Sequence, residues 1–167
     1  SSDLDATLEN MWQSGAAEGL PATIAFEFDR PYKLYEMKIW NHNTVNESFM
    51  GMGAKNVTIE IADSNAGPWT LLAEVVLDKA LGGAGAPVTN TIPMLGAVAS
   101  NLRMVITTNQ LGFAPATGLA EVQFFYLPVA ARELKATLDD TEATLAWRGG
   151  REAATHQVYL DVIANQA

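Results

Sequence analysis

The chain contains no cysteine among its 167 residues. This absence excludes a disulfide framework, a thiolate metal site and a cysteine nucleophile. Histidine is nearly as scarce, since His42 and His156 are the two in the chain; three histidine ligands for zinc are therefore excluded. Neither a Gly-x-Ser-x-Gly motif nor a phosphate-binding loop with its lysine occurs. We predict that the protein is not an enzyme.

Basic residues are also few. Ten Lys and Arg stand against 19 Asp and Glu, which gives a net charge of -9. Nucleic acids and anionic membrane surfaces both require clustered basic side chains, so neither is an expected partner. No apolar run reaches the roughly 18 residues of a membrane-spanning helix, so membrane insertion is not expected either. A cation or a neutral, polar ligand suits this charge.

Alternation with period two dominates what is present. Apolar residues at every second position indicate strands with one buried face. Turn-forming residues separate these runs, and one such turn is expected at Asp29-Arg30-Pro31. The clearest examples are Ile24–Phe28, Val57–Ile61, Leu102–Ile106 and Val122–Tyr126. No sustained helical pattern occurs, and short helix-like stretches are expected around 5–12 and 96–100. The fold class is therefore all-β, an antiparallel jelly-roll β-sandwich with a C-terminal β extension.

The alternation stops after Tyr126, at Leu127-Pro128. We predict one domain over 1–127 and a linker with a partial second β module over 128–167. Strands are expected at Glu142–Trp147 and Gln157–Ile163, and they resemble the opening of a fibronectin type III or immunoglobulin-like sandwich. Because such a domain needs roughly 100 residues, we interpret the chain as part of a longer, multi-domain protein.

Six short motifs occur in an order that resembles the discoidin family, the C-type domains of coagulation factors and their bacterial galactose-binding-like relatives. They are Met11-Trp12-Gln13-Ser14, Ile24–Phe28, Tyr32–Asn41 with its terminal Trp40-Asn41, Asn56–Ala62, Leu102–Ile106 and Gly118-Leu119-Ala120-Glu121-Val122. The resemblance implies a non-catalytic module that binds glycans or a surface polymer, in an extracellular or periplasmic bacterial protein. It also places Trp12, Trp40 and Trp69 in the core.

The resemblance further implies one structural Ca²⁺ between the N-terminal loop and the last strand. Calcium is bound by six to eight oxygen atoms. Glu121 stands at the matching position of the last strand, and Asp3, Asp5 and Thr7 are the candidates for the remaining ligands. The alternative is that Glu121 is a solvated strand residue.

The binding surface implied by the resemblance lies on loops at one end of the sandwich. Sugar recognition needs an apolar face and planar hydrogen-bonding groups. The 42–54 loop contains His42, Asn43 and Phe49, and the 109–117 loop contains Asn109 and Phe113; the 14–20 loop adds Ser14 and Glu18. Phe49 and Phe113 either stack on a ligand or close the end of the core.

Two other hypotheses stay open at this stage. One is a structural spacer or protein–protein interaction domain, which would contact neighbouring domains of the parent protein and bind no small ligand. The other is a small hydrolase on a jelly-roll scaffold, in which replacing His42 by alanine would abolish turnover.

Overall fold

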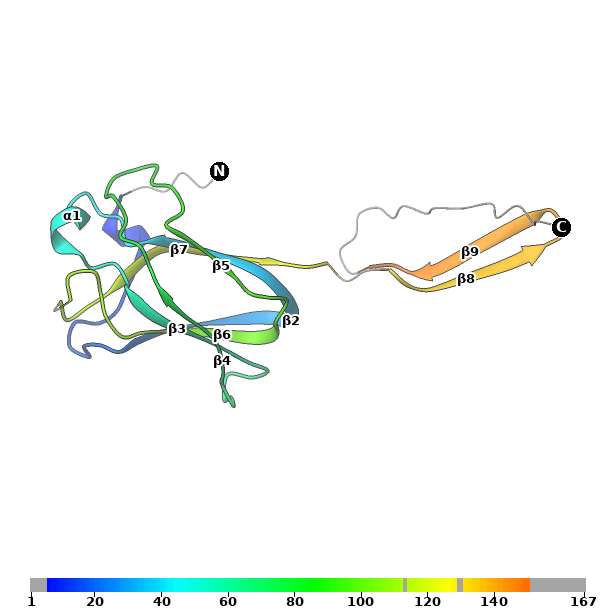
Figure 1. Ribbon diagram of the computed structural model, residues 1–167, viewed down its shortest axis with the longest axis horizontal. Helices are drawn as coiled ribbons and strands as arrows, with labels where there is room; N and C mark the ends of the chain where they lie inside the picture. Colours follow the sequence, from blue (N-terminus) through cyan, green and yellow to red (C-terminus); the bar gives the residue numbers. More distant parts are fainter. Residues whose placement is uncertain (1–5, 113, 129–130, 151–167) are drawn as a thin grey trace. The chain divides into compact units, whose positions relative to one another are not determined.

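The computed structural model describes residues 6–112, 114–128 and 131–150. The chain divides into two compact units, Ser1–Leu127 and Pro128–Ala167. The first unit is an antiparallel β-sandwich (Figure 1). Its strands are β1 (Trp12–Gln13), β2 (Ala22–Asn41), β3 (Asn56–Ala62), β4 (Thr70–Val76), β5 (Asn90–Pro93), β6 (Val98–Ile106) and β7 (Gly118–Tyr126). The predicted all-β fold class is confirmed.

Strand β2 belongs to both layers of the sandwich. Its first half pairs with β6, which continues through β3 to β4, and these strands form one layer. Its second half pairs with β7 and with β5, and β1 adds to the outer edge of β7. The register shifts between Glu27 and Tyr32, where β2 leaves one layer and enters the other. A twisted strand that changes layers closes one side of the sandwich covalently.

The turn expected at Asp29-Arg30-Pro31 is wrong, because β2 runs without interruption through these residues. Proline has no N–H to donate to a neighbouring strand, so it is tolerated at a bulge or at an irregular point of a sheet. Pro31 stands within the register shift, where the ladder to β6 is already interrupted. The Asp29-Arg30-Pro31 segment therefore marks the point where β2 changes layer, and the chain does not reverse its direction there.

The core lies between the two layers. Alternate residues of β3 and β6 point into it, and Ile59, Met104 and Ile106 have no solvent exposure. From the other layer, Met37 and Ile39 of β2 meet them. Aromatic rings fill the space where β2 changes layer, with the ring centroids of Phe26, Phe28, Tyr32, Phe124 and Tyr126 at 4.7–5.9 Å in successive pairs.

Two short helical turns complete the described part of the first unit. A 3-10 turn, Leu8–Asn10, lies within the predicted helix-like stretch 5–12. The helix α1, Glu47–Met50, interrupts the loop between β2 and β3. The helix-like stretch expected at 96–100 is wrong, because β6 begins at Val98.

The second unit contains a hairpin of β8 (Arg132–Asp139) and β9 (Glu142–Arg148), paired antiparallel. The strand expected at Glu142–Trp147 is confirmed. Its partner β8 was not expected, and the strand predicted over Gln157–Ile163 lies outside the described residues. The likeness to a partial fibronectin type III or immunoglobulin-like module stays a prediction.

Candidate functional site

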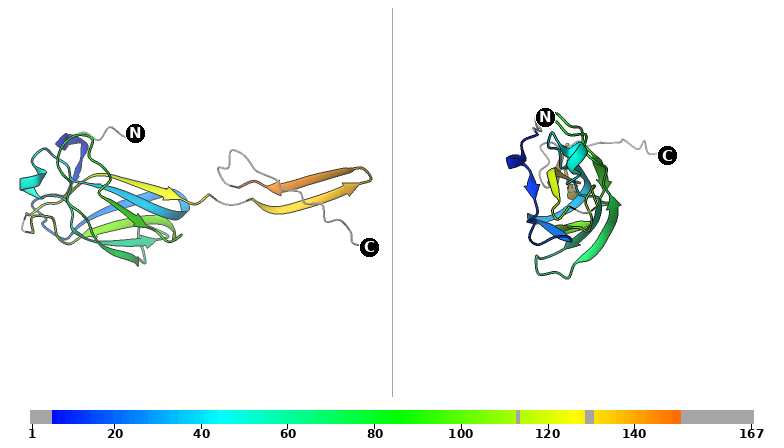
Figure 2. Two further views of the ribbon diagram at one scale, coloured as in Figure 1. Left: turned by 45° about the horizontal axis from the view of Figure 1, so that its top comes forward. Right: turned by 90° about the vertical axis from the view of Figure 1, so that its left-hand side faces the viewer.

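Four loops meet at one end of the first unit, which we call the loop end. They are residues 14–21, 42–55, 77–89 and 107–117, and the right-hand view of Figure 2 looks onto them. Backbone hydrogen bonds connect neighbouring loops: Leu111 N donates to Gly51 O at 2.8 Å, and Ser14 N donates to Thr117 O at 2.9 Å. The loops therefore form one connected surface and not four independent segments.

His42 is the centre of a buried polar network below this surface. Its ring nitrogen Nδ1 lies 2.5 Å from Oε2 of Glu47, and its Nε2 lies 2.9 Å from Nε2 of Gln13. The second carboxylate oxygen of Glu47 accepts a hydrogen bond from Gly53 N at 2.9 Å. With a carboxylate at Nδ1, the ring donates its proton there, and Nε2 accepts from the amide of Gln13. The network joins β1 to the loop that contains α1.

The amide side chains at this end are occupied by loop backbone. Asn43 accepts a hydrogen bond from Gly82 N at 3.0 Å and donates to Gly83 O. Asn109 donates to Ala114 O at 2.8 Å and to Ala116 O at 3.0 Å, and accepts from Gly112 N at 2.7 Å. Loop backbone groups that leave the sheets need such partners when they are buried.

Direct contact of His42, Asn43 and Asn109 with a ligand does not fit their burial. Their exposed fractions are 0%, 1% and 0%, so a ligand in solvent meets none of their polar atoms. The structure gives them a different part: they hold the loops that form the surface. Sequence reasoning could not tell a supporting amide from an exposed one, because burial depends on contacts distant in sequence.

Phe49 has the opposite environment. It lies on α1 and is 83% exposed, so it does not close the end of the core, which was the alternative left open by the sequence. Phe113, the second aromatic candidate, lies outside the described residues.

Other exposed apolar side chains accompany Phe49. Together they form what we call the apolar rim: Val45, Phe49, Met50, Leu81 and Leu111, with exposed fractions from 37% to 83%. These residues belong to the 42–55, 77–89 and 107–117 loops, which contact one another. A Cβ added to Gly51 would lie 2.9 Å from Leu111 N, and one added to Gly82 would lie 2.9 Å from Thr44 O. Exposed apolar side chains concentrated on neighbouring loops are typical of a binding surface.

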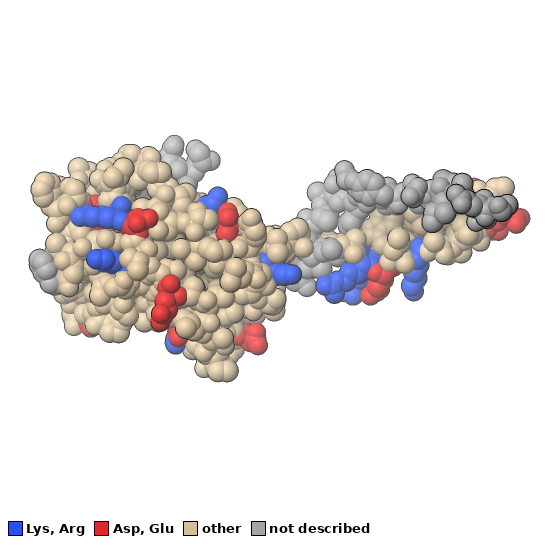
Figure 3. Space-filling view, viewed as in Figure 1, with Lys and Arg blue, Asp and Glu red and all other residues tan. Residues whose placement is uncertain are grey.

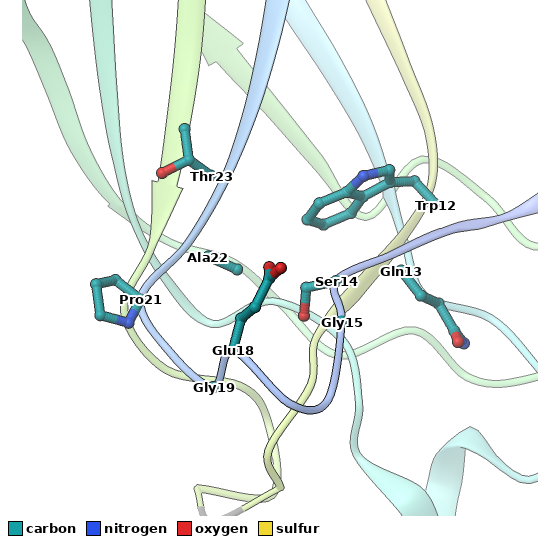
Figure 4. A pocket seen from close by; sticks show the side chains of 9 residues that line it. All are labelled: Trp12, Gln13, Ser14, Gly15, Glu18, Gly19, Pro21, Ala22 and Thr23. Atoms are coloured by element: carbon teal, nitrogen blue, oxygen red, sulfur yellow. The ribbon is translucent and has the colours of Figure 1, made fainter.

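A cavity of about 390 Å³ opens beside the first loop. It lies between β1 and the start of β2, which are edge strands of the two layers. Its lining consists of Trp12, Gln13, Ser14, Gly15, Glu18, Gly19, Pro21, Ala22 and Thr23 (Figure 4). The sequence named Ser14 and Glu18 of this loop; it gave no indication that Trp12 and Thr23 would lie on either side of them.

The proposed calcium ligands are only partly within the described residues. Asp3 and Asp5 lie outside them. Thr7 is exposed and precedes the 3-10 turn, while Glu121 is half-buried and accepts a hydrogen bond from Gln123 at 2.5 Å. Trp12 pairs with Leu119 antiparallel, so the chain before Trp12 runs toward Glu121. Within the described residues, no group of three or more His, Asp or Glu is placed to hold a metal ion.

The predicted core tryptophans differ from one another. Trp12 packs against the core, as expected. Trp69 is half-buried, and the guanidinium of Arg103 lies 4.4 Å from its ring centroid. Arg103 in turn contacts Glu60 at 2.5 Å, directly across from it in the sheet. Trp69 therefore belongs to a cluster with two charged residues. Trp40 is half-buried opposite Glu121.

Together these features define a class, an antiparallel jelly-roll β-sandwich with a loop surface at one end. No protein-family model matches the sequence, and no curated protein matches it by sequence. Solved structures do match the fold, and they include carbohydrate-binding modules of the CBM32 type.

Three solved structures illustrate the match. A family 89 glycoside hydrolase from Clostridium perfringens, in complex with its substrate GlcNAc-α-1,4-galactose, is similar at TM-score 0.52 and 16% identity over 75% of this chain; the match spans 12% of the hydrolase. The module CpGH89CBM32-5 from the same organism, in complex with GalNAc-β-1,3-galactose, matches at TM-score 0.50 and 14% identity, over 69% of this chain and 74% of the module. The CBM32 of AlyQ, in complex with 4,5-unsaturated mannuronic acid, matches at TM-score 0.51 and 14% identity, over 75% and 84%. At these identities the similarity establishes the fold.

Proposed function

We propose that the chain is a non-catalytic glycan-binding module of a larger extracytoplasmic protein and that the loop end is its binding surface. The observation that carries this proposal is the exposure of Phe49, whose aromatic ring is 83% exposed. Its loop is held in place by the buried hydrogen bonds of Glu47 with His42 and Gly53 N. Two neighbours with the same fold are complexes with GalNAc-β-1,3-galactose and with 4,5-unsaturated mannuronic acid.

The chemistry of Phe49 suits a sugar ring. The C–H groups on one face of a pyranose are apolar, and an exposed aromatic ring offers them a flat partner, while hydroxyls at the edge of the sugar need polar groups nearby. Asn46 and Ser48 are exposed on the same loop. Lys79 lies beside them, since its Nζ donates to Ser48 O at 2.9 Å.

The rigidity of the loop supports the same proposal. Binding is weakened when a loop must be ordered at the moment of association. Glu47 lies two residues before Phe49 in α1. Its carboxylate is hydrogen-bonded both to His42 and to Gly53 N. The loop is therefore closed from residue 47 to residue 53 before any ligand arrives. A shallow surface of this kind gives weak single-site affinity, and neighbouring modules of the parent protein would add avidity.

The distribution of basic side chains bears on the kind of ligand. On the face shown in Figure 3, Lys and Arg of the first unit are scattered and do not form a patch, which disfavours nucleic acid as a partner. Within the described residues, no helix has the length and apolar character that crossing a membrane requires.

The test is binding of the full chain to a broad glycan array with calcium present, followed by titration of the hits. Phe49→Ala should weaken binding about fivefold to thirtyfold, because a stacking aromatic contributes about 1–2 kcal/mol. Tyr35→Ala is the matched control, since Tyr35 is also an exposed aromatic, at 55%, but lies in β2 outside the loop end. Equal loss in both variants, or none in Phe49→Ala, would contradict the assignment.

The second candidate function is a spacer or protein-interaction domain, and the apolar rim is the observation that favours it. A blank glycan array together with a cooperative melt would favour this alternative. It predicts that Phe49→Ala and Leu81→Ala weaken capture of the neighbouring domain of the parent protein, measured by surface plasmon resonance with that domain immobilised.

A further inference from the structure

The cavity beside β1 is lined by one aromatic ring, Trp12, and one carboxylate, Glu18. The Trp12 side chain packs against the core and also lines the cavity (Figure 4). Opposite it, the Glu18 side chain folds back over the loop, since a Cβ added to Gly15 would lie 3.6 Å from its Cδ and Oε2. Figure 4 shows the Glu18 carboxylate pointing into the space between Ser14, Ala22 and Trp12.

Two further side chains have fixed roles at the cavity. Ser14 Oγ accepts a hydrogen bond from Thr117 N at 3.0 Å, so its hydroxyl hydrogen is left to donate elsewhere. Gln13 points away from the cavity, toward His42, with which its amide is bonded. Ser14 and Glu18 therefore supply the donor and the acceptor at the loop, and Trp12 supplies the apolar face. Thr23 also lines the cavity, but its hydroxyl points away from the Glu18 carboxylate (Figure 4).

Size and composition agree with a small hydroxylated ligand. The volume of about 390 Å³ is near the lower end of the range of about 300–1,000 Å³ for small-molecule sites. An aromatic wall with a few convergent polar groups is the combination that binds one face of a sugar ring and orients its hydroxyls. Glu18 is the only charged residue among the nine that line the cavity.

We infer that this cavity is a sugar subsite for a neutral or amino-substituted residue and that Glu18 excludes uronic acids from it. The inference rests on the proposed glycan-binding function and names the class of sugar. Because Glu18 makes no hydrogen bond or ion pair with the described residues, its carboxylate is available to accept hydrogen bonds from ligand hydroxyls. Such charge-assisted hydrogen bonds are stronger than those between neutral groups. A ligand carboxylate in the same space meets an uncompensated like charge, in a chain whose net charge is already -9.

The expected selectivity follows from Coulomb's law. At about 4 Å, two like charges near a protein surface repel enough to change affinity at least about fivefold. Salt screens exposed charges, with a Debye length of about 8 Å at 0.15 M and about 3 Å at 1 M. Discrimination against uronic acids should therefore weaken in 1 M NaCl, whereas a preference due to shape alone would not change.

The experiment uses the ¹⁵N-labelled full chain at pH 7 and follows the indole N–H of Trp12 by NMR, assigned with Trp12→Phe. Galactose, galactosamine and galacturonic acid share one ring configuration and differ in charge; glucose, glucosamine and glucuronic acid form a parallel series. The neutral and amino sugars of at least one series should shift the Trp12 signal in a saturable way. The uronic acid should bind at least about fivefold more weakly.

Glu18→Gln tests the charge itself. We expect this variant to lose the discrimination against uronic acids and to bind the amino sugar less well. The matched control is Glu27→Gln, which makes the same change in net charge at an exposed position of β2, outside the cavity lining. If Glu27→Gln changes selectivity as much as Glu18→Gln, the effect belongs to the net charge of the chain and the assignment of Glu18 is overturned.

Two outcomes separate this inference from the proposed function. Glycans that shift the amides of residues 46–52 but leave Trp12 unchanged would overturn the subsite and preserve the loop-end surface. A uronic acid that shifts Trp12 as strongly as its neutral counterpart would overturn the selectivity. Glycan-array hits that shift neither region would overturn both.

Discussion

His42 Nδ1 and Glu47 Oε2 lie 2.5 Å apart, and the two side chains are 1% and 0% exposed. Glu47 also accepts a hydrogen bond from Gly53 N, and His42 also contacts Gln13. One buried pair therefore joins the edge strand β1, the end of β2 and the α1 loop. The position of Phe49 at the surface depends on a contact that no solvent reaches.

Removal of one member of this pair should destabilise the protein. Glu47→Ala leaves His42 and Gly53 N without their acceptor, and an unsatisfied buried group of this kind costs about 3 kcal/mol or more. We expect a loss of about 3–5 kcal/mol in the free energy of unfolding, measured by urea denaturation. The amide signals of residues 47–53 should also lose protection from hydrogen exchange before the rest of the unit does.

The control for this variant is Glu74→Ala, because Glu74 is exposed in β4. Its effect should be within about 0.5 kcal/mol, the usual range for surface substitutions. A similar midpoint for Glu47→Ala and Glu74→Ala would show that the buried pair does not hold the loop.

Gly118 limits the space around the same network. A Cβ at this position would lie 2.6 Å from Cδ2 of His42 and 3.0 Å from the backbone oxygen of Trp12. Because His42 is held on both sides, it cannot move away without breaking its hydrogen bonds. Gly118→Ala should therefore cost about 1–3 kcal/mol, as overpacking does, and should shift the Trp12 indole signal.

Gly15→Ala is the matched glycine control in thermal melts of both variants. Its added Cβ would meet Glu18 atoms at 3.6 Å, which is ordinary contact distance. A Gly118→Ala protein as stable as Gly15→Ala would contradict the close approach of His42.

Strand prediction succeeded where one face of a strand is buried. Val57 and Ile59 alternate with Thr58 and Glu60 in the sequence, and the structure buries the apolar pair. Periodicity carries this information because a strand exposes every second side chain to the same layer. The continuous strand β2 was divided in two by Pro31, because local turn chemistry does not reveal that a strand changes layer.

Prediction of the site was limited by contacts distant in sequence. Asn43 is bonded to Gly82 and Gly83, and Asn109 to the 112–116 segment. An asparagine faces solvent or holds a loop depending on whether backbone groups of another segment lie within hydrogen-bonding distance. The amino-acid sequence near the asparagine does not specify this. The cavity was missed for the same reason, since Trp12 and Thr23 line it together only because the fold brings β1 and the start of β2 to one place.

Arg103 should contribute little to stability despite its contacts. It stacks on Trp69 at 4.4 Å and pairs with Glu60, but its side chain is 32% exposed. Exposed cation–π contacts and surface ion pairs each contribute about 0.5–1 kcal/mol. Arg103→Lys keeps the charge and loses the planar guanidinium, so we expect a loss below about 1 kcal/mol in urea denaturation. A loss above about 2 kcal/mol would show that the cluster is part of the core.

The calcium prediction has its own measurement. Antiparallel pairing of Trp12 with Leu119 directs the preceding chain toward Glu121, where Asp3, Asp5 and Thr7 are the predicted additional ligands. A ligand that binds the folded state alone stabilises it by RT ln(1 + [L]/Kd), about 2.7 kcal/mol at one hundred times Kd. Millimolar Ca²⁺ should therefore raise the melting temperature above that in excess chelator by several degrees.

Glu121→Gln should remove most of this increase, because the amide oxygen lacks the charge that a calcium ligand supplies. Glu36→Gln, in the neighbouring strand β2, makes the same change in net charge and should leave the increase intact. Mg²⁺ at equal concentration tests the metal, since its smaller, octahedral coordination suits a flexible oxygen set poorly. Superimposed melts with chelator and with Ca²⁺ would mean that Glu121 is a solvated strand residue and that the N-terminal segment is attached by β1 pairing without a metal.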